Sequence, residues 1–138
     1  MRKGFTCGAF DLLHVGHVLL FEECKKVCDY LIVGLQENPN IDRPAKNKPV
    51  ETIIERQIRL RACKYVDEII IYKTEKDLEK LLRKLDITVR IVGADNIGKD
   101  FTGKDICNQR QIEIHYAKRD HSYSSSSLRR RIRMADKN

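Results

Sequence analysis

The 138-residue sequence contains no tryptophan, and phenylalanine and tyrosine bring its aromatic content to only 7%. Proteins that bind single-stranded nucleic acid stack the bases on aromatic side chains interleaved with basic ones. No such interleaving occurs here, so the sequence disfavours nucleic acid as a partner. The formal net charge of +7 is spread through helix-like segments and suits an anionic partner, which includes a nucleotide.

Long hydrophobic runs are also absent. No stretch reaches the length of about 18 consecutive apolar residues that a membrane-spanning helix needs. The short apolar run at the N-terminus is interrupted by Asp11, which does not suit a signal peptide. We therefore expect a cytoplasmic protein without a membrane span, folded as a single domain over residues 1–138.

Cysteine is present in an odd number, five, and no two cysteines form a CxxC pair. This pattern disfavours a zinc site and a disulfide framework. Cys24 and Cys28 are one helical turn apart among apolar neighbours, so we expect them to be small hydrophobic residues of the core.

Short β-like apolar runs alternate with longer runs of helical periodicity along the chain. The predicted strands span residues 2–7, 30–35, 68–72, 88–92 and 111–116, and the predicted helices span residues 17–28, 52–65, 75–85 and 124–135. This alternation predicts an α/β fold with a Rossmann-like, doubly wound, mainly parallel sheet. Ligands of such sheets bind beyond the carboxyl ends of the strands.

A pair of histidines marks the first strand-to-helix connection. Residues 8–17 read GAFDLLHVGH and place His14 and His17 where the strand ends and the helix begins. Free backbone amides and the helix dipole attract phosphate at such a point. Imidazole donors can follow the charge that develops on a phosphoryl oxygen, and Gly8 lets the backbone approach a ligand closely. The motif predicts a phosphate site.

A serine run precedes the last predicted helix. Residues 121–132 read HSYSSSSLRRRI, with serines at 124–127. One serine suffices to cap the helix, and further hydroxyls with Arg129 can hold phosphate oxygens. A flexible polar tail is the alternative interpretation. Because Leu128 and Ile132 give the following segment helical periodicity, we predict a second phosphate site on a helix that starts at 124.

A long loop is predicted between the second strand and the second helix. Residues 36–50 contain all three prolines and lack apolar periodicity. Loops of this length are commonly functional lids or mobile segments. Lys46 and Lys48 lie in this loop, where flexible lysines usually serve solubility alone.

The two motifs carry a resemblance to a known family. GAFDLLHVGH resembles the GxFDxxHxGH signature of the cytidylyltransferase-like nucleotidyltransferases, which transfer a nucleoside monophosphate from a nucleoside triphosphate. The stretch from Tyr123 to Leu128 resembles the C-terminal signature of the family, and the family arginine five residues before its first serine falls on Arg119. ERQIRLRACKYVDEI is similar to its ERxxxLxxxxYVDE stretch, and glycerol-3-phosphate cytidylyltransferases are the most similar subgroup.

Residues and resemblance together imply a reaction in which CMP passes from CTP to a small phosphorylated alcohol, releasing pyrophosphate. The implied catalytic residues are His14, His17, Lys46 and Arg119. The implied nucleotide contacts are Gly8, Ala9, Phe10, His14, His17, Lys48, Gly93, Asp95, Arg119, Ser124, Ser125, Ser126 and Arg129. The implied acceptor contacts are Asp11, Lys46 and Asn96. The resemblance also implies a homodimer and a Mg²⁺ ion bound through the triphosphate rather than directly by protein ligands.

The acceptor side departs from the glycerol-3-phosphate pattern. The subgroup has GDDW where this chain has residues 93–96, GADN, and a tryptophan and a lysine near Glu75 and Leu78. The segment GKDFTGKD is instead similar to the sugar-phosphate adenylyltransferases of heptose activation. An adenylyltransferase that uses ATP and a sugar phosphate is therefore an alternative, and a non-catalytic nucleotide- or RNA-binding module is another.

Overall fold

The computed structural model describes residues 1–137 and contains one five-stranded sheet in the order β3-β2-β1-β4-β5. Its strands are β1 (Lys3–Gly8), β2 (Tyr30–Gln36), β3 (Glu68–Tyr72), β4 (Val89–Gly93) and β5 (Glu113–Ala117). Every neighbouring pair is parallel. The predicted Rossmann-like α/β fold is confirmed.

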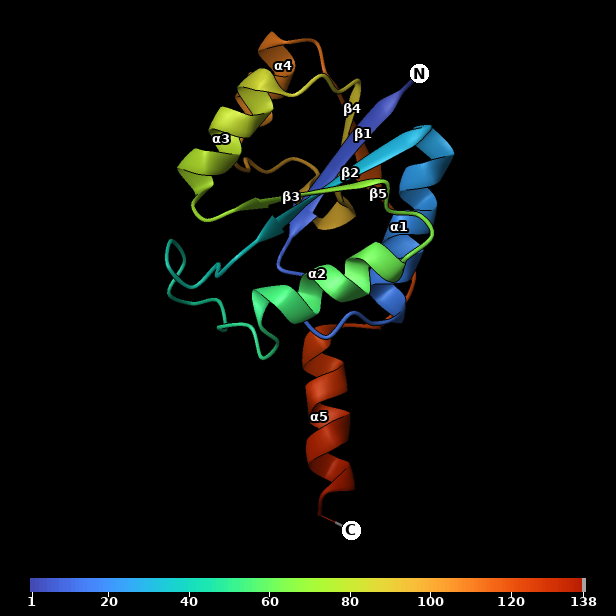
Figure 1. Ribbon diagram of the computed structural model, residues 1–138, viewed down its shortest axis with the longest axis vertical. Helices are drawn as coiled ribbons and strands as arrows, with labels where there is room; N and C mark the ends of the chain where they lie inside the picture. Colours follow the sequence, from blue (N-terminus) through green and yellow to red (C-terminus); the bar gives the residue numbers. More distant parts are fainter. Residues whose placement is uncertain (138) are drawn as a thin grey trace.

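Helices cover both faces of this sheet (Figure 1). α1 (Val15–Val27) and α2 (Ile53–Ala62) lie on one face, and α3 (Glu75–Lys84) and α4 (Lys104–Gln109) lie on the other. Phe21 and Leu60 belong to the first core cluster, whereas Leu82 and Cys107 belong to the second. Because both faces of the sheet are covered, β2 with the sequence YLIVGLQ is a nearly continuous apolar run rather than an alternating one.

The order of the strands reverses between β1 and β4. The chain runs outward from β1 through β2 to β3, then crosses through α3 to β4 on the other side of β1. Open parallel sheets bind ligands at such a switch point, beyond the carboxyl ends of the strands. Gly8 and Gly93 end the two strands there and mark the edge at which a ligand site is expected.

Several predicted boundaries need correction. α1 begins at Val15 and not at His17, because His14 takes the N-cap position. α2 ends at Ala62 and not at Tyr65, since the Cys63 amide closes the last turn on Leu60. The sequence analysis missed α4 and a short 3-10 helix at 94–96 because they are too short to show a periodicity.

Two segments stand apart from the layered core. Residues 37–52 contain turns but neither helix nor strand. α5 (Ser125–Ala135) extends away from the sheet and has no buried residue (Figure 1). No helix within residues 1–137 is long and apolar enough to cross a membrane.

Arg56 on α2 is a buried arginine that connects this helix to the loop after β1 and to the end of β2. Its side chain is 2% exposed, although the sequence pattern is typical of a helix surface. Its guanidinium donates to the carbonyls of Gln36 and Glu37 at 2.7 and 2.6 Å, and to that of Ala9 at 3.0 Å. The loop after β1 and the end of β2 are thereby fixed to α2.

Candidate functional site

The start of α1 orients both histidines through their own ring nitrogens. Nδ1 of His14 accepts from the Gly16 amide at 3.0 Å, and Nδ1 of His17 accepts from the His14 amide at 3.2 Å. A neutral imidazole that accepts at Nδ1 carries its proton on Nε2. Each ring therefore keeps an Nε2–H donor, the arrangement that a phosphate ligand requires.

Phe10 packs against the histidine pair. Its ring meets the His17 ring edge-on with centroids 5.3 Å apart, and packs against Phe21 at 5.1 Å. The backbone of Phe10 adopts a left-handed φ of 47°, which turns the side chain into the core. The Phe10 side chain is thereby buried beside the His17 ring, and contact of this residue with the nucleotide stays a prediction.

Both histidines are neutral near pH 7. The pKa of His17 is lowered from 6.5 to about 3, because burial and then the charge of the neighbouring His14 lower it more than the charge of Asp11 raises it. Burial, followed by the charges of His121 and Arg119, also lowers the pKa of His14. The pair thus offers neutral donors rather than fixed cations.

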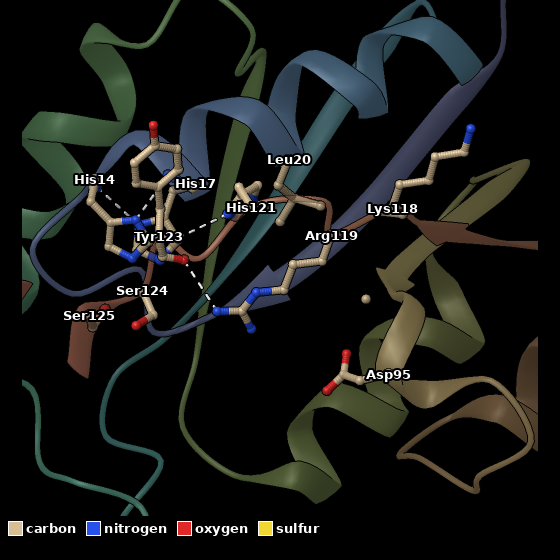
Figure 2. Close-up of a pocket in the computed structure, with 13 residues that line it drawn as sticks. His14, His17, Leu20, Asp95, Lys118, Arg119, His121, Tyr123, Ser124 and Ser125 are labelled. Atoms are coloured by element: carbon tan, nitrogen blue, oxygen red, sulfur yellow. Dashed lines mark hydrogen bonds between the residues drawn. The ribbon is translucent and has the colours of Figure 1, made fainter. Parts of the chain in front are cut away.

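The histidines open onto a cavity of about 300 Å³. Arg119 extends across it and donates to the Tyr123 carbonyl at 3.2 Å, with Asp95 on the opposite wall (Figure 2). Lys118 also belongs to the lining, but its ammonium points away from the histidines (Figure 2). The structure therefore brings the predicted residues His14, His17, Gly93, Asp95 and Arg119 to one cavity.

The N-terminus of α5 forms the remaining wall. Ser124 caps the helix by accepting from the Ser127 amide at 3.0 Å, and both Ser124 and Ser125 line the cavity. Ser126 is exposed and is not part of this lining. A Cβ on Gly16 would lie 3.1 Å from the Tyr123 carbonyl oxygen, so glycine permits the two helix starts to pack closely. Two helix N-termini thus face one cavity.

Asp11 and Arg129 do not face this cavity. The Asp11 carboxylate accepts from the Val50 and Glu51 amides at 2.8 and 2.9 Å and pairs with Arg129 at 2.8 Å. Burial alone raises the pKa of Asp11, but these three donors bring it below its ordinary value. Each of these two side chains is paired with the other, and the acceptor contact of Asp11 and the phosphate contact of Arg129 stay predictions.

The two loop lysines also lie away from the histidines. Lys46 is exposed, and Lys48 lies at a different cavity, beside Arg56 and Lys73. Both belong to the segment without helix or strand. The structure does not bring them to the predicted phosphate site.

A second cavity of about 240 Å³ adjoins the first, sharing Leu20 and Gly93 with it. The predicted residues Gly8 and Asn96 lie here rather than at the first cavity. The sequence analysis missed three polar residues of the lining, which come from β2, the following loop and β4: Gln36, Arg43 and Arg90. It also missed two at the first cavity, Lys118 and His121. A charged residue at position 90, inside an otherwise apolar strand, was the signal that could have found one of them.

Comparison with known sequences agrees with this geometry. A family model described as cytidylyltransferase-like matches residues 5–131. The chain is 32% identical to glycerol-3-phosphate cytidylyltransferase from Bacillus subtilis (strain 168), over 96% of this chain and 98% of that protein. It is 33% identical to bifunctional protein HldE from Campylobacter curvus (strain 525.92), over 96% of this chain but only 28% of the length of that relative.

Solved structures show the same fold. A lipopolysaccharide core biosynthesis protein from Thermoplasma volcanium GSS1 superimposes with a TM-score of 0.68 and 24% identity, covering 90% of this chain and 99% of that one. Pantothenate synthetase from Thermus thermophilus gives a TM-score of 0.59 at 12% identity, covering 86% of this chain and 55% of that one. At these identities the likeness concerns the fold alone.

Proposed function

The chain belongs to the cytidylyltransferase-like family of nucleotidyltransferases, and on that premise we propose that it transfers CMP from CTP to a small phosphorylated alcohol such as glycerol 3-phosphate. The observation that carries this proposal is the His14–His17 pair, which opens onto the same cavity as Arg119 and the start of α5. Similarity to a glycerol-3-phosphate cytidylyltransferase over nearly the whole of both chains supports this choice of substrates.

The chemistry is an in-line displacement at the α-phosphorus. An oxygen of the acceptor phosphate forms a bond to this phosphorus, the bond to the bridging β-phosphate oxygen breaks, and pyrophosphate leaves with the electron pair. Positioning and charge stabilisation supply the rate without a covalent enzyme intermediate. The Nε2–H groups of His14 and His17 donate to the phosphoryl oxygens on which charge develops, and Arg119 stabilises the departing pyrophosphate.

The remaining nucleotide contacts follow from the lining of the first cavity. Gly93 and Asp95 line this cavity at and just after the end of β4, and Ser124 and Ser125 line it at the start of α5. In the proposal, the first two meet the nucleoside and the two serines meet the phosphates. Lys46 and Lys48 reach the triphosphate in this scheme when their segment closes over the cavity. Their exposure and the absence of helix or strand in residues 37–52 of the described chain support such a movement.

A Mg²⁺ ion fits the proposal as a companion of the triphosphate. Within residues 1–137, no three His, Cys, Asp or Glu side chains form a ligand set, and Asp95 is the carboxylate in the lining of the first cavity. This donor set suits an ion held mainly by phosphate oxygens, with Asp95 available from the protein. When bound, the ion neutralises phosphate charge and orients the leaving group.

We further propose that the protein functions as a homodimer. α5 projects from the domain and carries two exposed apolar side chains, Ile132 and Met134. Light scattering at micromolar concentration tests this, since a monomeric mass contradicts it.

A second candidate function is transfer of AMP from ATP to a sugar phosphate. The segment with the sequence GKDFTGKD places Phe101 and Thr102 in the lining of the second cavity, where an acceptor would bind. HldE proteins match this chain over most of its length, with 33% and 32% identity in two bacteria. The two candidates differ in base and acceptor but use the same triphosphate site.

Release of pyrophosphate tests the proposal. The protein is incubated with Mg²⁺, with CTP or ATP, and with glycerol 3-phosphate, other phosphorylated alcohols or sugar phosphates. We expect acceptor-dependent release with CTP and a phosphorylated alcohol. Release only with ATP and a sugar phosphate selects the second candidate, and tight RNA binding without any release favours a non-catalytic module.

A further inference from the structure

Arg90 is a buried cation within the parallel sheet. It lies in β4, between β1 and β5, and only 4% of its surface is exposed. Arginine is almost never buried to this extent unless its charge is paired. An isolated charge in such a place carries a large desolvation penalty, so its surroundings should reveal what balances it.

No carboxylate balances Arg90 within the described chain. Its guanidinium donates to the Thr102 carbonyl and, weakly, to Cys7 Sγ at 3.9 Å, and it lies 5.0 Å from the centre of the Phe101 ring. None of the ion pairs among residues 1–137 includes it. Its Nε has no hydrogen-bond partner. The positive charge is held in position and left uncompensated.

Gln36 at the end of β2 is a second buried donor without a partner. The residue is 1% exposed, and its Oε1 accepts from Arg43 at 3.2 Å, which orients the amide. Its Nε2 then has no hydrogen-bond partner in residues 1–137. Arg43 itself is paired with Glu75 at 3.2 Å, so the carboxylate of this lining is already neutralised. Gln36 and Arg90 line the same second cavity.

We propose that the second cavity binds the phosphate group of the acceptor, with Arg90 and Gln36 as its specificity-determining residues. A phosphate in this cavity would supply the countercharge that Arg90 lacks, and a guanidinium and a side-chain amide are donors suited to its oxygens. The second cavity shares Leu20 and Gly93 with the first cavity. An acceptor held in the second cavity therefore adjoins a triphosphate bound in the first. The inference rests on the proposed function and narrows the acceptors to anionic ones with a phosphate.

Steady-state kinetics of Arg90→Met test this assignment, with the acceptor identified by the pyrophosphate assay. Methionine fills much of the space of the arginine stem without its charge. We expect the KM of the phosphorylated acceptor to rise about 10- to 100-fold, the range expected for lost charge-assisted hydrogen bonds. The KM of the nucleotide should stay unchanged, and Arg90→Lys should recover part of the acceptor affinity. Equal rises in both KM values, or none, overturn the proposal.

Phe101→Leu is the matched control for a purely structural role. It removes the ring that packs on the Arg90 guanidinium but leaves the charge in place. If Arg90 only anchors the loop around Thr102, both variants should change the melting temperature and the acceptor KM alike. We expect only the Arg90 variants to change the acceptor KM.

Binding can be measured even if no turnover is found, which separates this inference from the proposed function. The NMR resonance of the Arg90 Nε–H, assigned by its loss in Arg90→Lys, is followed while inorganic phosphate or glycerol 3-phosphate is added. We expect a saturable shift that persists in Arg119→Met, in which the first cavity loses its arginine. An Arg90 resonance that neither anion shifts at millimolar concentration overturns the inference.

Discussion

The imidazole rings of His14 and His17 stack with their centroids 3.8 Å apart and their planes 24° from parallel. At this separation a proton on one ring strongly disfavours a proton on the other. The two rings are therefore suited to donate one hydrogen bond each while both are neutral. A positive charge on either ring would need a bound phosphate to stabilise it.

His17→Asn should reduce turnover much more than stability. Asparagine keeps a side-chain oxygen that can accept from the His14 amide but lacks the Nε2–H donor. We expect kcat to fall about 100- to 1000-fold, as for the loss of one donor to a developing oxyanion. Steady-state kinetics and thermal melting measure the two effects, and a melting loss that parallels the loss of activity contradicts a catalytic role.

The buried His17 should make folding stability depend on pH. The unfolded chain takes up a proton as the pH falls through 6.5, whereas burial keeps the folded pKa near 3. The contribution of His17 to the free energy of unfolding is therefore complete above pH 6.5. It is lost as the pH falls toward 3, by up to about 1.4 kcal/mol per pH unit.

Urea unfolding of wild type and His17→Asn at a series of pH values isolates this contribution from that of other groups. As the pH drops below 6.5, the free energy of unfolding of the wild type should fall relative to that of the variant, because only the wild type carries the buried His17. A difference that is constant over this range contradicts the assigned pKa.

Asp11→Asn should destabilise the attachment of α5. The change leaves Arg129, whose Nε has no partner within residues 1–137, without its carboxylate. Breaking a largely buried pair in this way should cost about 2 kcal/mol of unfolding free energy. The double variant Asp11→Asn with Arg129→Met should lie closer to wild type than Asp11→Asn alone, and strict additivity of the two changes contradicts the pairing.

Ser124→Ala should weaken both α5 and nucleotide binding. The hydroxyl caps the helix through the Ser127 amide, and its loss costs about 1 kcal/mol. Ser127→Ala is the matched control, because it retains that amide and lies outside the lining of the first cavity. Calorimetric titration with CTP should show lower affinity only for the Ser124 variant, and equal affinities contradict the second helix N-terminus as a phosphate site.

Local sequence signals were sufficient for the sheet and for the centre of the site. Apolar runs and, for the last strand, alternation of apolar with polar residues predicted all five strands. The histidine and serine motifs predicted residues that line the first cavity. Each of those features depends on neighbours in the chain. The order of the strands and the switch point then follow from the general rules of parallel sheets.

Contacts between residues that are far apart in the chain could not be predicted from local sequence patterns. Asp11 pairs with Arg129, 118 positions later, and nothing near either residue indicates its partner. Arg90 lines the second cavity together with residues that are distant in the sequence. Its place there depends on how α3, α4 and the sheet pack against one another. The lining of the second cavity is therefore the part that required the structure.

The fate of the α-phosphorus distinguishes nucleotidyl transfer from every other use of the triphosphate. The protein is given Mg²⁺, an acceptor and CTP or ATP labelled either at the α-phosphorus or at the γ-phosphorus. We expect the α-label in a nucleotide–acceptor product and the γ-label in pyrophosphate, and we expect His14→Ala to abolish both. Transfer of the γ-label to the acceptor, or no transfer of either label to any phosphorylated acceptor, would contradict the proposed function.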